Sequence, residues 1–426
     1  MSEKTILVWF RNDLRVHDNE ILSEAARKAD KILPVYCFDP FYFRKNPSGN
    51  PKTGNLRARF LLESVSNLRE NLRHISGELI IRVGDPAEIL PALAEEYQVS
   101  EVYHHREVAH EETEISERVE AALWKIKLNL KHFIGHTLYH KEDLPFPIKD
   151  IPDSFAVFKK KIERDSTVRP CIDTPVTIST PVIRDAGELP ALSSLGLTEP
   201  FNDPRSAAQF SGGEDAALEQ LSRHFLHIEP GASKNGRAHT RPSVLSPWLA
   251  MGCLSLRQVY WEVVKHHQSG EPVHSSLLLD LLWRDYFRFM FKKHGQKFIA
   301  VKTTSAKNEK ATDQNTPFEN WKNGETGVPL IDAIMHKLNA TGYISNEKRQ
   351  IVAGFLINEL KVDWIKGAEY FEEKLIDYSP ASNWGNWAFI AGVNDPRESR
   401  YHIVNPQIEQ DVKNDFTDTW LPGLLA

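Results

Sequence analysis

A carboxylate, an indole and a guanidinium occur at helical spacing near residue 280. Asp280, Trp283 and Arg284 stand at positions i, i+3 and i+4, so they share one face of a predicted helix. Burying charged groups costs free energy unless a polar group lies opposite, which makes this face a candidate binding surface. A surface ion pair between Asp280 and Arg284, beside a packed tryptophan, explains the spacing equally well.

A second polar cluster follows a predicted turn at Gly342. Ser345 or Asn346 can cap the next helix, because both side chains accept hydrogen bonds from backbone amides. Asn346, Arg349 and Gln350 then fall on one face near the start of that helix. Such a face suits a planar polar ligand, although the bare pattern is weakly specific.

The stretch from Asn383 to Trp387 combines two asparagines, two tryptophans and a glycine. Asparagine is a poor helix former, and an exposed tryptophan adds to an apolar surface patch. Packing alone therefore explains this cluster badly, and we favour a functional interpretation of it.

The composition excludes several classes of protein. The chain has 426 residues and a formal net charge of −6, which argues against a uniformly cationic nucleic-acid coat but allows a local basic surface. Cys37, Cys171 and Cys253 have neither disulfide-framework nor metal-site spacing, so we expect no metal and a reducing compartment. No apolar run reaches the roughly 18 residues of a membrane span, and we see no signal peptide. We therefore expect a cytoplasmic protein of bacterial type with no membrane partner.

Residues 1–135 alternate between β-rich runs and amphipathic stretches. This alternation predicts a Rossmann-like, doubly wound parallel sheet of five strands. The expected strands are Thr5–Phe10, Lys31–Phe38, Leu79–Val83, Glu101–His104 and Lys131–Ile134. Helices are expected near 19–29, 56–74, 86–97 and 107–128, with Asp85 and Pro86 as the start signal of the third.

The rest of the chain is predicted to be a connector followed by helices. Residues 136–205 contain many prolines and one short predicted helix, 154–165, which indicates a long interdomain linker. From 206 to 426 the β-rich runs vanish, so we expect an all-α domain. Its helices are predicted at 214–226, 247–251, 255–268, 275–294, 317–322, 328–340, 346–362, 367–376 and 382–391. The expected fold class is therefore α/β plus all-α.

Several segments of this chain, in order and at matching spacing, resemble the signature segments of the photolyase/cryptochrome family. They are Trp9–Asn19, Trp283–Phe287, Thr341–Gln350, Asp363–Trp364 and Asn383–Trp387. Other features resemble the DASH branch of that family, namely Gln350, Ser382–Trp387, Asp395–Glu398 and Leu144–Pro147. The likeness spans nearly the whole chain.

The resemblance implies that the helical domain binds FAD in a folded, U-shaped form. The loop formed by Ser243, Val244, Leu245 and Ser246 matches the one that holds the diphosphate, and free N–H groups at a helix start suit an anion. The other residues that match flavin contacts are Arg284, Asn346, an ion pair of Arg349 with Asp377, and Asn383, which matches the residue facing flavin N5. An amide at that position can donate or accept as N5 changes protonation.

The activity implied by the resemblance is blue-light-driven repair of cyclobutane pyrimidine dimers in single-stranded or looped DNA, by an electron from reduced flavin. The lesion would be flipped into a pocket, with Trp283 stacking on it, Asp280 bonding to it and Gln350 lining the cavity. Asn383 completes the expected catalytic set, and Trp387 and Trp364 match the electron-transfer tryptophans nearest the flavin. We expect the protein to act as a monomer.

The first domain of the family cradles an antenna pigment. Glu107 matches a glutamate that contacts a reduced folate, so we expect 5,10-methenyltetrahydrofolate as the antenna. Without the resemblance, Glu107 is simply an acid in the first turn of a helix, where the helix dipole favours it.

A basic stretch over 286–310 fits a DNA-facing rim under the same resemblance. Its basic residues are Arg288, Lys292, Lys293, Lys297, Lys302, Lys307 and Lys310, against the single acid Glu309. The plainer interpretation is a solvated helix end and loop.

Two departures from the family pattern concern the chemistry. Asp280 stands where the family usually has Glu, so its contact with a lesion would be longer or water-mediated. Ala311 stands where a third, surface tryptophan of the electron-transfer chain should fall. We hypothesise that photoreduction of the flavin is slowed, or that it proceeds through another aromatic residue, such as Trp321 or Tyr343.

Two other functions are weighed against repair. A photoreceptor would use the same flavin pocket but signal through a partner protein or nucleic acid. A flavin-free structural module would require all the matched segments to be coincidental. Flavin bands in the absorption spectrum exclude the module, and a repair assay separates the first two.

Overall fold

The computed structural model describes residues 3–46, 48–205, 210–226, 244–268, 275–300, 315–393 and 415–421. The chain forms two compact units. Unit 1 comprises Met1–Phe43, Arg59–Gly196 and Ser211–Gly295, and unit 2 comprises Arg44–Ala58, Leu197–Phe210 and Gln296–Ala426. The division into domains 1–135 and 206–426 with a linker at 136–205 rests on sequence character, and it stays a prediction.

Unit 1 contains a parallel five-stranded sheet with the order β3-β2-β1-β4-β5. Its strands are β1 (Thr5–Phe10), β2 (Lys31–Phe38), β3 (Ile80–Val83), β4 (Val99–His105) and β5 (Leu130–Phe133). Every residue of β1 is buried, because helices cover both faces of such a sheet. The predicted doubly wound sheet is confirmed, and each predicted strand end is within two residues of the observed one.

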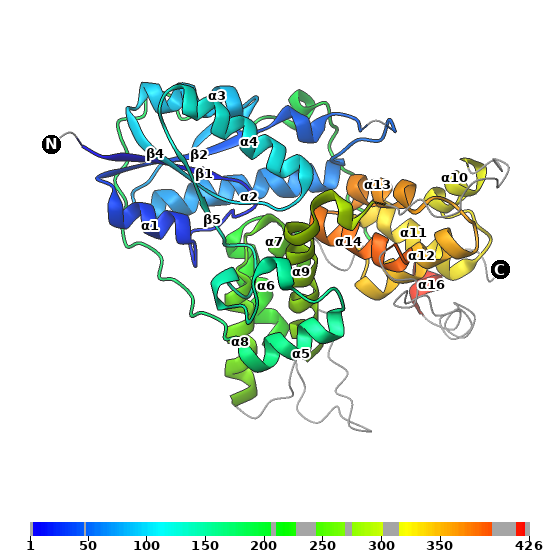
Figure 1. Ribbon diagram of the computed structural model, residues 1–426. Coiled ribbons are helices and arrows are strands. Elements are labelled where there is room, and N and C mark those ends of the chain that lie inside the picture. The colour runs from blue at the N-terminus through cyan, green and yellow to red at the C-terminus, as the bar shows by residue number, and fades with distance from the viewer. Residues whose placement is uncertain are drawn as a thin grey trace. The chain divides into compact units, whose positions relative to one another are not determined.

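Four helices follow the strands, with α1 and α2 on one side of the sheet and α3 and α4 on the other (Figure 1). They are α1 (Glu20–Lys28), α2 (Asn55–His74), α3 (Pro86–Glu96) and α4 (His110–Lys125). The Asn19 side chain caps α1 by accepting a hydrogen bond from Leu22 N at 3.2 Å. Asp85 caps α3 in the same way, accepting from Ala87 N at 2.9 Å. Each cap satisfies a backbone donor that the first turn of a helix leaves unpaired.

The proline-rich connector is part of the fold of unit 1 up to Gly196. It contains the predicted helix, α5 (Phe155–Asp165). Beyond α5 its backbone hydrogen-bonds to the sheet: Ile32 N donates to Ser179 O at 2.7 Å, and Ile81 N donates to Ala186 O at 2.8 Å. Ile81 belongs to β3, an outer strand, so the connector covers an edge that would otherwise expose unpaired backbone groups.

All the helices predicted after residue 206 occur. Unit 1 holds α6 (Glu214–Leu226), α7 (Ser246–Met251), α8 (Leu256–Gln268) and α9 (Ser275–His294). Unit 2 holds α10 (Asn315–Asn323), α11 (Pro329–Thr341), α12 (Asn346–Asn358), α13 (Trp364–Lys374), α14 (Pro380–Ile390) and α16 (Asp415–Trp420). We did not predict α16. None of the helices in the described ranges is long and apolar enough to cross a membrane.

The prediction of a helix over 346–362 was four residues too long, because α12 ends at Asn358. Lys361 adopts a positive φ of 54°, and Val362 N donates to Leu356 O at 3.1 Å. This left-handed residue and the backward hydrogen bond form a common helix end. The apolar pattern continues past it because Val362 is buried in the core of unit 2.

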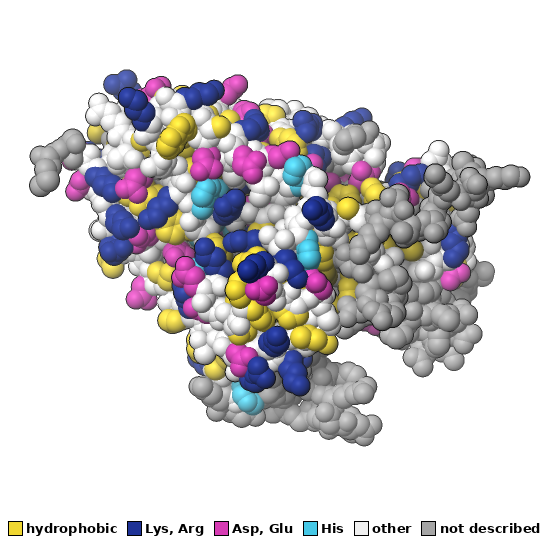
Figure 2. All heavy atoms as spheres, viewed as in Figure 1, with side chains coloured by type: hydrophobic (Ala, Val, Ile, Leu, Met, Phe, Trp, Pro, Cys, Tyr) yellow, Lys and Arg dark blue, Asp and Glu magenta, His cyan; other side chains and the backbone are white. Residues whose placement is uncertain are grey.

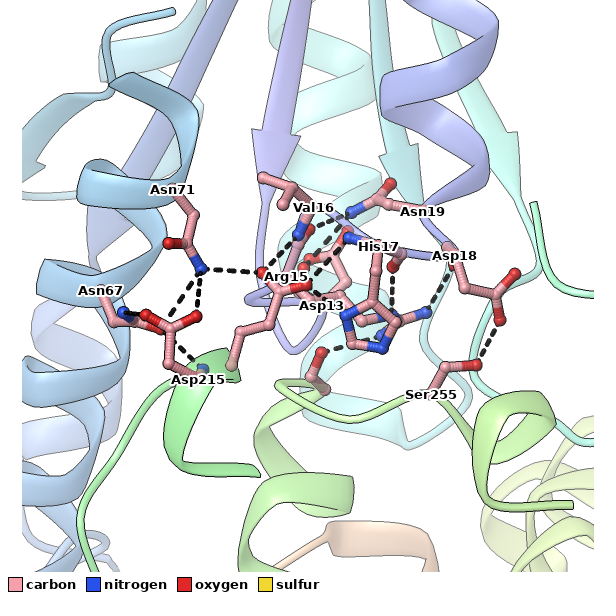
Figure 3. A network of polar contacts seen from close by, with 12 residues as sticks. Asp13, Arg15, Val16, His17, Asp18, Asn19, Asn67, Asn71, Asp215 and Ser255 are labelled. Atoms are coloured by element: carbon pink, nitrogen blue, oxygen red, sulfur yellow. Dashed lines mark hydrogen bonds and ion pairs between the residues drawn. The ribbon is translucent and has the colours of Figure 1, made fainter. Parts of the chain in front are cut away.

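The signature segment Trp9–Asn19 has a structural role within unit 1 (Figure 3). The Glu214 carboxylate, at the start of α6, accepts hydrogen bonds from the backbone of Val16 and His17, both at 2.9 Å. Asp18 is fully buried and pairs with Arg257 of α8 at 2.6 Å. These bonds tie the loop after β1 to the helices of unit 1, which accounts for the polar residues concentrated there.

Candidate functional site

Most of the predicted site residues of unit 2 line one recess. Its volume is about 50 Å³, and its walls come from α12, α13, α14 and the loop 375–379. The lining residues predicted from sequence are Asn346, Arg349, Gln350, Asp377, Asn383 and Trp387. The recess therefore gathers side chains that are far apart in sequence.

The expected ion pair of the recess is present. Arg349 Nη2 lies 2.6 Å from Asp377 Oδ2, and the Asp377 side chain is 1% exposed. Arg349 Nε also donates to Ile344 O at 3.0 Å, which fixes the plane of the guanidinium. Of the two caps proposed for α12, the structure has Ser345, whose hydroxyl accepts from Lys348 N. Arg349 thus lies in the first turn of a capped helix, with its charge balanced by a buried carboxylate.

Asn383 lies buried in the first half of α14. Its Nδ2 donates to Ala368 O of α13 at 3.0 Å. That bond assigns the orientation of the amide, and it makes Oδ1 the atom that can accept a hydrogen bond in the recess. A group with an N–H donor would fit there.

The two tryptophans expected to transfer electrons, Trp387 and Trp364, both contact other aromatic rings of unit 2. Trp387 is 2% exposed and lies edge-on to Phe371, with ring centroids 5.1 Å apart. Trp364 meets Trp384 instead, at 5.9 Å, and it does not line the recess. Gly367 makes room for Trp387, because a Cβ at that position would lie 2.3 Å from Trp387 Cη2. Ala311 lies outside the described residues.

Arg284 lies on α9 in unit 1, where its Nη2 donates to Leu249 O of α7 at 2.8 Å. Its buried Nε has no hydrogen-bond partner among the described residues. Burial, aided by the charge of Arg288, lowers the pKa of Arg284 to about 10. A half-buried cation with a buried, unused Nε donor is compatible with an anionic ligand nearby.

The residues around Arg284 differ in their surroundings. Trp283 stacks on Phe155 of α5, with centroids 3.5 Å apart and planes at 10°, so one face of the indole is covered. Asp280 is exposed. Leu245 is buried and Ser246 begins α7, the helix that Arg284 contacts. Val244 precedes them, and Ser243 lies outside the described residues.

Glu107 lines a separate cavity of about 340 Å³ in unit 1. The cavity is bordered by the basic residues Arg106, Lys141, Arg288 and Lys292 and by the acids Glu107 and Glu117. Glu107 is 2% exposed, and its Oε2 accepts from Arg288 Nη2 at 2.8 Å. Burial alone would raise the pKa of Glu107, but nearby cations such as Arg288 hold it well below its usual range.

A second acid, Glu112, is buried beside Glu107. The Asn12 side chain donates to both, at 2.9 Å to Glu107 and 3.3 Å to Glu112. Burial, together with the charge of Glu107, raises the pKa of Glu112 to about 8. Glu112 is therefore protonated at neutral pH and stays close to an ionised neighbour without repelling it.

The predicted basic rim over 286–310 is wrong for two of its residues. Arg288 is buried against Glu107, and Lys293 Nζ donates to Ile151 O and Asp153 Oδ1, both at 2.7 Å. Lys302, Lys307 and Lys310 lie outside the described residues. On the face shown in Figure 2, Lys and Arg side chains are interspersed with Asp and Glu.

Three interactions of these sites were missed from sequence. Arg288 was assigned to a surface, although it stands at i+4 from Arg284 and so on the same helix face. Asp285 is fully buried and accepts from Leu138 N at 2.9 Å and Tyr139 N at 3.0 Å, which anchors the start of the connector to α9. Glu112 carries no sequence signal, because its acidity depends on Glu107.

Comparison with known proteins agrees with this architecture. Residues 6–177 match the family model described as DNA photolyase, and residues 277–426 match the FAD binding domain of DNA photolyase. The chain belongs to the photolyase/cryptochrome family. It carries that family's FAD-binding domain, and its function is of the FAD-dependent, photolyase-like kind.

Several relatives bear the name Cryptochrome DASH. One from Gloeobacter violaceus is 42% identical over 100% of this chain and 87% of its own length. One from Synechocystis is 41% identical over 99% of this chain and 88% of its own. The crystal structure of a Synechocystis cryptochrome, 39% identical, covers 100% of this chain and 90% of that chain with a TM-score of 0.91. An archaeal photolyase from Sulfolobus tokodaii, solved with two FAD molecules, is 26% identical, covers 99% of this chain and 91% of that chain, and has a TM-score of 0.79.

Proposed function

We propose that this protein uses blue light and reduced FAD to split cyclobutane pyrimidine dimers in single-stranded or looped DNA, acting as a monomer. The observation that carries the proposal is the recess of unit 2, where the Arg349–Asp377 pair and Asn383 lie together at family-matched positions. An ion pair and an oriented amide, beside the buried Trp387, suit a planar redox cofactor.

Bound FAD would supply the absorption of blue light and the transferred electron. The residues of the chain would bind FAD and set the stability of its reduced form. Arg349, oriented by Asp377, places a positive charge where an anionic reduced ring is stabilised. Oδ1 of Asn383 accepts from a protonated ring nitrogen without adding charge. Asn346 supplies a further polar contact at the start of α12.

The diphosphate of FAD is assigned to the segment at the start of α7, with Ser243, Val244, Leu245 and Ser246 at the matched positions. Arg284 supports this assignment, because it hydrogen-bonds to α7 and its Nε remains available for an anion. A guanidinium binds phosphate through a rigid fork of donors.

The lesion is assigned to Trp283, Asp280 and Gln350. Trp283 is held in place by its stacking on Phe155, and at its family-matched position we assign it to stack on a base of the lesion. Asp280 is exposed, so a water molecule can bridge its carboxylate to a pyrimidine carbonyl. For electron supply we assign Trp387, which lines the recess, and Trp364.

The antenna is assigned to the cavity at Glu107, with 5,10-methenyltetrahydrofolate as its ligand. The basic border of the cavity suits the carboxylates of a folate tail. Glu107, kept ionised by Arg288, suits the N–H donors of a pterin ring.

The competing function is a photoreceptor that binds the same cofactor with little repair. The test is illumination of oligo(dT) that contains a thymine dimer, in the presence of reduced protein, with a dark sample and a duplex as controls. We expect light-dependent repair that is faster in the single strand than in the duplex. A yellow, FAD-containing protein that leaves the dimer intact would favour the photoreceptor.

A further inference from the structure

A buried arginine from the N-terminal half of the chain lies beside the loop that supplies Asp377. Arg57, in the first turn of α2, is 5% exposed and belongs to unit 2 through the segment Arg44–Ala58. Neither the sequence motifs nor the recess lining includes it. Burying an arginine so completely is costly unless its donors are paired.

The guanidinium of Arg57 is paired with the end of α13. It donates to the carbonyl of Glu372, to Leu375 O at 3.0 Å and to Thr53 Oγ1 at 3.0 Å. The last carbonyls of a helix lack partners within the helix and carry its partial negative charge. Arg57 thus acts as a side-chain cap for α13.

A second set of contacts clamps the same helix end. Lys52 Nζ pairs with Glu372 Oε1 at 2.8 Å, and both side chains are at most 5% exposed. Gly54 N donates to Glu373 O at 3.0 Å, an approach so close that a Cβ on Gly54 would lie 2.7 Å from that oxygen. The segment 52–57 is therefore fitted to the end of α13.

The clamp continues into the loop that carries Asp377. The Arg57 guanidinium lies over the ring of Tyr378, 4.8 Å from its centroid. On the other side of Asp377, Ile376 N donates to Gly342 O at 3.0 Å. Asp377 stands between these two fixed points, and its carboxylate orients Arg349.

We infer that Arg57 is a positioning residue for the flavin site: it fixes the loop 375–379 so that Asp377 holds Arg349 against the cofactor. The inference rests on the proposed assignment of FAD to this recess. It predicts that a change at Arg57, which does not line the recess, alters the properties of the bound flavin through Asp377.

The test is Arg57→Lys in the full-length protein, with FAD content, FAD dissociation rate and flavin midpoint potential as readouts. An ammonium has three donors and no planar face, so it cannot make all the contacts. We expect FAD to dissociate about tenfold faster, a typical effect of a displaced supporting residue, and the potential to become more negative. Thr53→Val, which removes one acceptor, should give a smaller change in the same direction and covers the case in which Arg57→Lys fails to fold.

Two controls separate positioning from general destabilisation. Arg69→Lys alters an arginine of unit 1 that is pinned by Glu78 and by Gly187 O, and it should leave the potential unchanged. In a protein that already carries Asp377→Asn, Arg57→Lys should cause no further shift of the flavin midpoint potential, because Arg57 acts on the flavin through Asp377. Additive shifts, or an unchanged flavin in Arg57→Lys, would overturn the inference alone. A wild-type protein that cannot bind FAD would overturn the proposed function as well.

Discussion

The ring of Trp321 lies edge-on to that of Trp387, with centroids 6.3 Å apart and planes at 76°. Trp321 is fully buried, and its other ring contacts include Tyr370 at 5.8 Å. Trp387 lines the flavin recess, so this contact links the recess to an aromatic cluster beyond it. Trp321 is one of the two aromatic residues hypothesised from sequence, and this contact connects it to the recess.

We predict that Trp321→Phe slows photoreduction of the flavin. Phenylalanine keeps the ring packing but is harder to oxidise than an indole, and it loses the bond from Trp321 Nε1 to Val352 O, at a cost of about 1 kcal/mol. Transient absorption should then show a tryptophan radical that recombines sooner than in wild type. Trp261→Phe, in unit 1, is the control. An unchanged radical lifetime would exclude Trp321 from the route.

We predict that Trp283→Ala retains FAD but loses most of its affinity for the dimer. Stacking of a base on an aromatic side chain contributes about 1–3 kcal/mol, which corresponds to a loss of roughly 5- to 150-fold in affinity. Binding of dimer-containing oligo(dT), with flavin absorbance measured on the same sample, checks this. Full affinity in the variant would remove Trp283 from the lesion site.

We predict that Glu107→Gln weakens binding of the folate without affecting FAD. The neutral amide of glutamine cannot replace the ionised carboxylate that Arg288 stabilises. A hydrogen bond to a charged group contributes about 1.5–3 kcal/mol, which is the size of the loss we expect. Reconstitution with 5,10-methenyltetrahydrofolate, followed by absorbance, measures the loss. Glu114→Gln, at an exposed position of α4, the helix that begins three residues after Glu107, is the matched control and should bind folate like wild type.

We predict that stability depends on pH through Glu112. Its pKa is about 8 in the folded protein against 4.5 as the ordinary value. Because the folded state holds a proton that the unfolded chain releases, this group's contribution to stability is complete below pH 4.5 and is lost as the pH rises toward 8. Glutamine stays neutral at every pH. The free energy of unfolding of Glu112→Gln should therefore rise relative to that of wild type by up to about 1.4 kcal/mol for each pH unit between 4.5 and 8. Urea unfolding at several pH values measures the difference, and parallel curves would contradict it.

Local sequence patterns were sufficient for the sheet and for most helix positions. Alternation of β-rich and amphipathic segments predicted the strands, and Asn383, Arg349 and Asp377 were placed together through their likeness to family motifs. Periodicity failed where a helix ended on a left-handed residue: the apolar pattern ran on to Val362, past the helix end near Lys361.

Interactions between distant segments could not be predicted in this way. Arg57 caps a helix more than three hundred positions away, and nothing in its neighbours marks it as buried. Arg288 was predicted to belong to a cationic surface because it lies in a sequence segment rich in lysine. The segment alone does not show that Arg288 pairs with the carboxylate of Glu107. Such pairings follow from tertiary packing, which a linear pattern does not encode.

The connector has a practical consequence for anyone who wishes to attach a reporter to this protein. Its prolines and the exposed side chains of Val176 and Val182 suggest a tolerant insertion point. Yet Ser179 and Ala186, on either side of Val182, accept hydrogen bonds from β2 and β3. A tag inserted between them would pull apart two backbone pairings of the sheet, so fusion partners belong elsewhere.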